Sequence, residues 1–361
     1  MNEVLFADAR MDALTADKSL PAKFRRMLVK LDLKPTVKGR TVAVKMHLGG
    51  NLGYTTIHPL FVRTLVEELK NARAKKILVM DGDTSGAPAR GYTQETIGAT
   101  IISCFGKSGK ETYRKKIGFG ALKWADYGVQ AWDADVFLDL SHIKGHGMCG
   151  FGGAIKNIAM GCVPPKTRGD IHRIQGGIVW HAKKCIRCKK CIKDCPRHAN
   201  HFSEAGEYWV DWHECTYCQH CVLACPKGAL VPSRNDFNRF QEAQAHVAAV
   251  FLRKFPADRR VFINFLTNIT IFCDCWGFSS PSLVPDIGII AGRNIVAVET
   301  ASLDKIKFSK LMWEGLPRGR KIVLKKGHLF QRIHGKDPYV QLRKMAKLGF
   351  GPASYKIVTV K

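Results

Sequence analysis

Eight of the 13 cysteines form two runs with the same spacing, C-x-x-C-x-x-C-x-x-x-C followed by proline. The first run consists of Cys185, Cys188, Cys191 and Cys195, and the second of Cys215, Cys218, Cys221 and Cys225. Thiolates at this spacing hold two cubane [4Fe–4S] clusters, and the fourth cysteine of each run ligates the other cluster. We therefore predict one cluster on Cys185, Cys188, Cys191 and Cys225, and a second on Cys215, Cys218, Cys221 and Cys195.

Zinc is the main alternative for closely spaced cysteines. Zinc sites usually combine C-x-x-C pairs with a longer spacer between them, which these runs do not match. Clusters that exchange their fourth ligands lie close together and suit electron relay, whereas a single cluster would be enough to staple a fold. The pattern favours a redox role over zinc binding or a purely structural role.

The cysteine count and the N-terminal residues also bear on location. The count is odd, and Met1-Asn2-Glu3 does not begin a basic and then apolar leader. We therefore expect a cytoplasmic protein without a disulfide framework. The apolar runs, such as residues 247–252, are far shorter than the roughly 18 residues of a membrane span, so no span is predicted.

Strand and helix patterns alternate on both sides of the cysteine runs. Short apolar runs predict strands at 41–46, 76–81, 135–140, 261–272 and 287–291. Amphipathic segments predict helices at 59–71, 93–104, 238–253 and 294–304. This alternation indicates an α/β fold with a mostly parallel sheet and helices on both faces. We expect residues 1–180 and 233–361 to form one body, interrupted at 181–232 by a small ferredoxin-like α+β dicluster module.

A glycine-rich segment follows the strand predicted at 135–140. Residues 141–161 contain Gly145, Gly147, Gly150, Gly152 and Gly153 and lead into a helical stretch from residue 154. Backbone N–H groups and the positive end of a helix dipole favour an anion at such a loop. The segment matches neither the P-loop nor the dinucleotide fingerprint. A tight crossover that needs glycine for steric reasons is the alternative, and we prefer the anion-binding interpretation.

Ionisable residues gather near the same predicted sheet edge. Lys45 and His47 lie at the end of the strand predicted at 41–46, and an Asp-Gly-Asp sequence at 81–83 ends the next strand. Ligands of parallel sheets bind at the carboxyl ends of strands. The candidates for proton transfer or anion contact at this edge are Lys45, His47, His142, His146 and Lys156.

Five cysteines lie outside the two runs: Cys104, Cys149, Cys162, Cys273 and Cys275. Cys273 and Cys275 flank Asp274 at the end of a predicted strand, so a third metal site or a reactive thiol is one interpretation. Buried cysteines more often act as small apolar side chains, and we favour that role. No flavin motif is recognised, so a further metal or a flavin in the body stays open.

The chain carries 57 Lys and Arg against 30 Asp and Glu, a net charge of +27. Residues 305–361 contribute 15 basic and two acidic side chains, nearly half of this excess. A basic surface suits an acidic electron-transfer partner or an anionic small-molecule substrate, and the alternative is simply a solvated basic face. Nucleic acid is disfavoured as a partner, because no RNA-binding motif is present and only 9% of residues are aromatic.

Three segments resemble the family catalogued as domain of unknown function 362. They are residues 142–162, the cysteine module, and residues 273–306, and residues 335–360 also resemble the family's usual ending. The resemblance implies an α/β body with an inserted [4Fe–4S] dicluster module, and it implies no substrate. Cys149, inside the glycine-rich segment, is not carried over as a functional position.

These observations lead to one expected function and one alternative. We expect an iron–sulfur oxidoreductase, or a reductase component, of anaerobic metabolism that passes electrons through two [4Fe–4S] clusters to an acceptor or anionic substrate in the α/β cleft. The alternative is an electron-transfer adaptor that docks an acidic enzyme through its basic surface and performs no chemistry itself.

Overall fold

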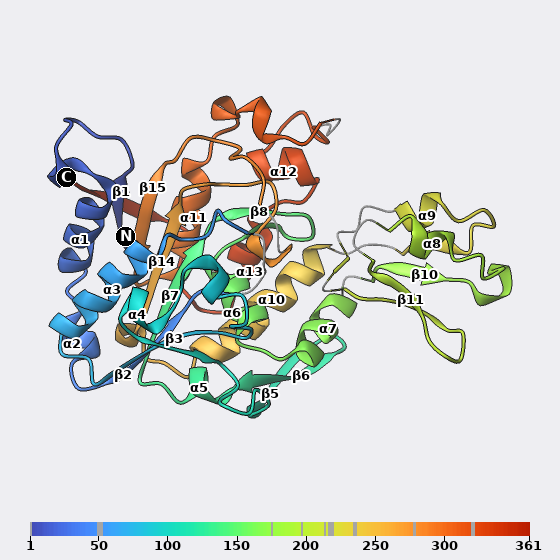
Figure 1. The fold of residues 1–361 in the computed structure, drawn as a ribbon, viewed down its shortest axis with the longest axis horizontal. Coiled ribbons are helices and arrows are strands. Elements are labelled where there is room, and N and C mark those ends of the chain that lie inside the picture. Colours follow the sequence, from blue (N-terminus) through green and yellow to red (C-terminus); the bar gives the residue numbers. More distant parts are fainter. Residues whose placement is uncertain are drawn as a thin grey trace.

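The computed structural model describes residues 2–48, 53–174, 176–195, 198–212, 214–215, 220–233, 237–276, 279–318 and 322–361. Its centre is an eight-stranded, mostly parallel sheet with the strand order β16-β1-β15-β14-β7-β2-β3-β4 (Figure 1). The strands are β1 (Asn2–Asp8), β2 (Thr41–Lys45), β3 (Lys76–Asp81), β4 (Thr100–Ser103), β7 (Val136–His142), β14 (Arg260–Leu266), β15 (Gly288–Gly292) and β16 (Tyr355–Val360). Only β15 runs antiparallel to its neighbours, β1 and β14.

Four adjacent strands, β3, β2, β7 and β14, run parallel, so their carboxyl ends meet at one edge. The register sets Lys45 of β2 opposite both Met80 of β3 and Asp139 of β7, and His142 of β7 opposite Phe265 of β14. Continuous apolar runs form these strands because helices cover both faces of the sheet. The polar residues that end the strands are thereby brought together.

Helices pack on both faces of the sheet. Phe24 of α1 (Leu20–Lys30) and Leu65 of α3 (Pro59–Asn71) belong to the core on one face. The core on the other face includes residues of α6 (Ala154–Gly161), α10 (Phe237–Leu252), α11 (Ile295–Lys305) and α13 (Val340–Lys347). Further helices of the α/β body are α2 (Lys34–Val37), α4 (Gln94–Ile97), α5 (Val129–Trp132), α7 (Pro165–Arg173) and α12 (Leu329–His334). The α/β fold expected from the alternating pattern is confirmed.

Two segments differ from the sequence prediction. The helix predicted at 93–104 is wrong: α4 ends at Ile97 because Gly98 adopts a left-handed φ of 75°, and the chain continues as edge strand β4. The strand predicted at 261–272 ends at Leu266, because the chain turns at Asn268, whose φ is 46°. Both turns depend on one residue that enters a backbone region most side chains avoid.

The cysteine runs lie in a small lobe that Figure 1 places at one end of the molecule. Here β10 (Ile178–Trp180) pairs with β13 (Leu230–Pro232), and β11 (Asn200–Phe202) pairs with β12 (Tyr208–Val210). The short helices α8 (Lys190–Lys193) and α9 (His220–Leu223) carry the third cysteine of the first and second run. The third cysteine of each run therefore lies on a short helix.

Two further hairpins complete the fold. They are formed by β5 (Thr112–Phe119) with β6 (Leu122–Gly128), and by β8 (Lys144–His146) with β9 (Gly150–Gly152). Across the described ranges, no helix is both long enough and apolar enough to cross a bilayer.

Candidate functional site

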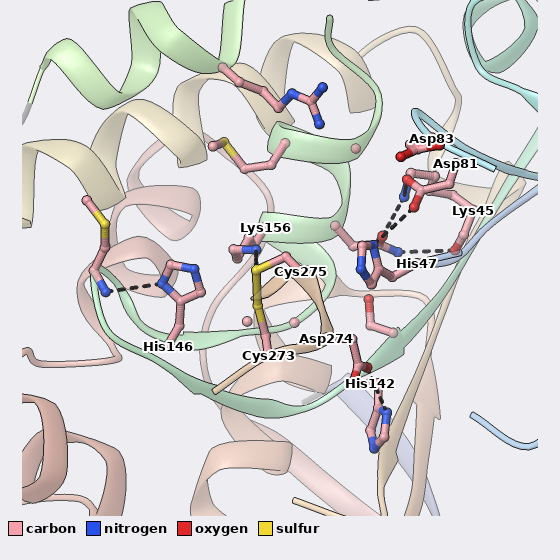
Figure 2. A pocket seen from close by; sticks show the side chains of 18 of the residues that line it. Lys45, His47, Asp81, Asp83, His142, His146, Lys156, Cys273, Asp274 and Cys275 are labelled. Atoms are coloured by element: carbon pink, nitrogen blue, oxygen red, sulfur yellow. Dashed lines mark hydrogen bonds and ion pairs between the residues drawn. A yellow bond between two sulfur atoms is a disulfide. The ribbon is translucent and has the colours of Figure 1, made fainter. Parts of the chain in front are cut away.

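A cavity of about 190 Å³ opens at the carboxyl ends of β2, β3 and β7 (Figure 2). The strands contribute one side, and other parts of the wall come from α6, α7, α10, the β8–β9 hairpin, the segment after β14 and Trp212. Its ionisable lining residues are Lys45, His47, Asp81, Asp83, His142, His146, Lys156, Arg168, His172, Asp274, Cys273 and Cys275. All five candidates named from the sequence, Lys45, His47, His142, His146 and Lys156, thus line one cavity.

The first polar centre is a buried ion pair between β2 and β3. Lys45 Nζ lies 2.9 Å from Asp81 Oδ1 and donates to Asn157 Oδ1, and its side chain is fully buried. Asp81 also accepts from the backbone N–H of Leu48, and its Oδ2 lies 3.0 Å from His47 Nδ1. Burial opposes ionisation of Asp81, but the ammonium of Lys45 outweighs it and holds the pKa of the carboxyl well below its ordinary value. The pair therefore stays charged.

The second polar centre lies at the ends of β7 and β8. Lys144 Nζ is 2.5 Å from Asp274 Oδ1, and it also donates to the carbonyl and the hydroxyl of Thr55 at 2.8 Å. His142 Nδ1 lies 3.5 Å from Asp274 Oδ2, and burial lowers the pKa of this imidazole. The segment after β14 is thus held to the β8–β9 hairpin by a buried ion pair that includes the residue between Cys273 and Cys275.

A third group lies between α6 and the β8–β9 hairpin. His146 accepts a hydrogen bond from Met148 N–H at its Nδ1 atom, and burial lowers the pKa of the ring well below its ordinary value. His146 is therefore neutral and carries its proton on Nε2. Lys156 Nζ lies 3.6 Å from Cys273 Sγ and 3.5 Å from Cys275 Sγ.

Cys273 and Cys275 are joined by a disulfide that lines the cavity. This is a local bond between close neighbours in the chain and not part of a disulfide framework. The sulfurs and His146 also present donor atoms within 4.8 Å of one another, a set that suits a soft metal. Sulfurs bonded to each other are not thiolates, so this set is complete only after reduction. The remaining cysteines, Cys104, Cys149 and Cys162, are fully buried among apolar side chains, as expected.

The glycine-rich segment forms the β8–β9 hairpin and the start of α6. Of its glycines, Gly152 and Gly153 line the cavity, whereas Gly145, Gly147 and Gly150 are not among the described lining residues. The first N–H group of α6, on Ala154, donates to the carboxyl of Glu299, which is fully buried. A Cβ atom at Gly153 would collide with that carboxyl. An external anion at this helix end would have to displace Glu299, so the anion-binding interpretation of the loop remains a proposal.

Glu299 makes protein stability depend on pH. Burial raises its pKa to about 8 from an ordinary 4.5, so between these values the folded chain keeps a proton that the unfolded chain has lost. Unfolding then releases a proton, and stability falls as pH rises through this window. We expect Glu299→Gln to lack this decrease in stability. As pH rises through the window, the unfolding free energy of the variant should increase by about 1.4 kcal/mol per pH unit relative to that of the unmodified protein.

Urea titrations at several pH values from 5 to 8 measure this difference. Glu67→Gln, at a side chain that is 41% exposed, provides the control for loss of a carboxyl outside the core. Parallel pH profiles for Glu299→Gln and the unmodified protein would contradict the assignment of a buried, protonated carboxyl.

In the small lobe, four cysteines line a second, much smaller cavity. They are Cys185, Cys188 and Cys191 of the first run and Cys225 of the second. Backbone N–H groups donate to sulfur at matching places in both runs, from Ala199 to Cys195 Sγ and from Ala229 to Cys225 Sγ, each at 3.2 Å. Cys195 is buried in a small core against which Cys215 packs, and Cys221 lies in the neighbouring core with Cys191. Cys218 lies outside the described residues.

Trp212 connects the lobe to the cavity, and this position was not predicted from the sequence. Its ring packs against the small core that contains Cys195 and also against the large core of the α/β body. It lines the same cavity as Lys45 and Lys156. Sequence reasoning also missed Asn157 and Arg168, which carry a hydrogen-bonding amide and a guanidinium to the cavity wall on α6 and α7. The contact between Asn157 and Lys45 joins segments 112 residues apart, so no local spacing in the sequence signals it.

Residues 42–304 match a family described as a domain of unknown function (DUF362). No curated protein matches the sequence. The structure is similar to that of a protein from Thermotoga maritima, with a TM-score of 0.37 and 12% identity, over 70% of this chain and 52% of that one. It is also similar to the lactate racemase apoprotein from Thermoanaerobacterium thermosaccharolyticum, with a TM-score of 0.31 and 12% identity, over 57% of this chain and 46% of that one. This chain thus spans about half of each structure.

Proposed function

This chain belongs to the DUF362 family, and we propose that it is an iron–sulfur protein that carries electrons through two [4Fe–4S] clusters to a ligand in the cavity of the α/β body. The observation that carries the proposal is the small cavity lined by three cysteines of the first run and the last cysteine of the second. This is the ligand set that the spacing predicts for one cubane cluster.

The surroundings of these cysteines fit such a cluster. Ligating sulfurs in iron–sulfur proteins accept hydrogen bonds from backbone N–H groups, which help to set the reduction potential. Cys185 accepts one from Arg187 N–H at 3.4 Å, in addition to those at Cys195 and Cys225. Cys185, Cys188, Cys191 and Cys225 would hold one cluster, and Cys195, Cys215, Cys218 and Cys221 the other. When bound, the clusters would supply one-electron transfer.

The position of Trp212 suggests an order for the two sites. Cys195 and Cys215, assigned to the second cluster, share a core with Trp212, which lines the cavity at the sheet edge. The first site is surrounded by seven exposed cations: Lys183, Lys184, Arg187, Lys189, Lys190, Lys193 and Lys227. An acidic donor would therefore dock at the first site, and electrons would leave from the second toward the cavity.

The cavity itself suits an anionic ligand. Lys45 and Lys144 are paired with Asp81 and Asp274. Within the described residues, Lys156 and Arg168 form no ion pair with a carboxylate. Both line the cavity, and burial lowers the pKa of each, so a negatively charged ligand would stabilise their charged forms. An iron–sulfur oxidoreductase or reductase component is the function that these features support best.

The exposed cations keep the adaptor as a second candidate. An adaptor would dock an acidic enzyme through this surface and bind nothing in the α/β cavity. Native mass spectrometry of the purified chain distinguishes the two, because an anionic ligand retained in the cavity, and lost from Arg168→Leu, would exclude a pure adaptor.

Docking through the basic surface predicts a specific effect of charge reversal. We expect the triple variant Lys183→Glu, Lys184→Glu, Arg187→Glu to accept electrons from a small acidic ferredoxin about tenfold more slowly at low salt, because complementary charge accelerates association. Stopped-flow reduction measures the rate. The control triple variant Lys30→Glu, Lys34→Glu, Lys38→Glu makes the same change in net charge at exposed positions on α1, on α2 and just after it, far from the lobe. Equal slowing in both variants would show that net charge, and not this surface, controls the rate.

A further inference from the structure

The disulfide between Cys273 and Cys275 lies where a redox group could act. Cys273 is 8% exposed and Cys275 is half-buried, and both sulfurs line the cavity that Trp212 of the small lobe also lines. Figure 2 shows the bonded sulfurs facing Lys156, between the side chains of His146 and Asp274. A disulfide that only stabilised the fold would not need to face a ligand cavity.

The segment that carries the two cysteines is held in place independently of the disulfide. Asp274, between them, forms the buried ion pair with Lys144 and lies 3.5 Å from His142. The sulfurs would therefore stay close together after their bond is broken. Reversible thiol–disulfide chemistry requires this closeness, because the same two thiols must meet again on oxidation.

Lys156 provides the charge that a reduced pair needs. Its Nζ lies 3.6 Å from one sulfur and 3.5 Å from the other. A cation at this distance stabilises a thiolate, the form of cysteine that reacts in thiol–disulfide exchange. Among the described residues, the titratable and charged groups around the sulfurs include Lys156 on α6, His146 on β8 and Asp274 in the segment itself.

We propose that Cys273 and Cys275 form a reversible two-electron redox centre of the cavity, which converts single electrons from iron–sulfur clusters into a pair. In the reductive step the S–S bond breaks, two electrons arrive one at a time, and two protons from solvent complete two thiols. In the reverse step, the dithiol gives two electrons and two protons to a two-electron acceptor and the S–S bond forms again. The electron source rests on the proposed function, whereas the thiol–disulfide chemistry does not.

The first experiment counts thiols in the full-length protein. Trypsin releases residues 261–293 as one peptide, which contains Cys273 and Cys275 and no other cysteine. The protein is equilibrated with mixtures of reduced and oxidised dithiothreitol and then alkylated with iodoacetamide. Mass spectrometry should find this peptide with either no alkyl group or two, and the alkylated fraction should change reversibly with a single midpoint potential. The variant Cys104→Ala, which lacks a buried thiol outside the cavity, should give the same curve. Two alkyl groups at every potential, or a pair that stays oxidised until the protein unfolds, would overturn the proposal.

The second experiment asks whether clusters feed this pair. Cluster-loaded protein is reduced with titanium(III) citrate, freed of excess reductant, and alkylated. We expect two alkyl groups on the peptide 261–293, and none in a Cys188→Ala, Cys195→Ala variant treated identically. Electron paramagnetic resonance shows whether the clusters are reduced. Reduced clusters together with a peptide 261–293 that stays oxidised would overturn this inference and leave the proposed function intact. Clusters that cannot be loaded would refute the proposed function, while the dithiothreitol titration would still decide the chemistry of the pair.

The third experiment tests Lys156 as a positioning residue for the thiolate. In Lys156→Met the reduced pair should react with iodoacetamide about tenfold more slowly at pH 7, and the rate should recover as pH rises by about one unit. A merely structural role would not move the pH profile. An unchanged pH profile would remove Lys156 from the proposal. If the reduced cysteines instead held one metal ion per chain, the redox centre proposed here would be wrong and the two cysteines would form a metal site.

Discussion

Replacing Cys188 and Cys225 together with alanine is expected to remove only half of the iron, although the two residues belong to different runs. Under the proposed ligation they serve the same cluster, so the double variant should fall from about eight iron atoms per chain to about four. Replacing Cys188 and Cys195 together should remove nearly all iron, although both belong to one run. The reason is that these two residues ligate different clusters.

This pair of variants separates crosswise from run-by-run ligation. If each run held its own cluster, the outcomes would be reversed, and Cys188→Ala, Cys225→Ala would be the variant without iron. Iron and acid-labile sulfide are measured on protein purified without oxygen. The variant Cys104→Ala serves as the control for loss of a buried thiol and should retain both clusters. The small cavity that brings Cys225 beside Cys185, Cys188 and Cys191 is the structural basis of this expectation.

Replacing Lys45 with methionine is expected to lower the unfolding free energy by about 3–5 kcal/mol. The change leaves the carboxylate of Asp81 buried without its cation, and it leaves Asn157 Oδ1 without its ammonium donor. Removing one partner of a buried ion pair is costly because the remaining charge keeps its desolvation penalty. Urea titration followed by circular dichroism measures the loss.

An exposed pair on α3 provides the matched control. Arg63 Nε lies 3.2 Å from Glu67 Oε1 on the solvent side, and Arg63→Met should cost less than about 1 kcal/mol. The double variant Lys45→Met, Asp81→Asn should lose less than the sum of its single variants, because it leaves no buried charge unpaired. Similar losses for Lys45→Met and Arg63→Met would contradict the assignment of Lys45 and Asp81 as a buried charged centre.

The sequence was informative where a local pattern determines the structure. The strands β2, β3 and β7 are continuous apolar runs, and a parallel sheet under helices requires such runs, so their ends could be located closely. The amphipathic segments 59–71 and 294–304 located the helices α3 and α11 to within one residue. Because parallel strands end at one edge, Lys45, His47 and His142 could be assigned to one site before any contact was known.

The remainder of the site depends on contacts between distant segments. Glu299, which occupies the start of α6, lies 145 residues away from Ala154 in the chain, and no spacing connects the two. Trp212 acquires its position only when the small lobe meets the α/β body. From the sequence, Cys273 and Cys275 were expected to act as buried apolar side chains, and only the structure joins them in a disulfide beside Lys156 and His146.

The most direct test of the central claim is an anaerobic spectroelectrochemical titration of the full-length chain, with iron and sulfide measured on the same sample. We predict about eight iron atoms and eight sulfides per chain, and reversible one-electron changes from two clusters. Zinc in place of iron and sulfide, or iron that undergoes no reversible redox change, would contradict the claim that this protein carries electrons.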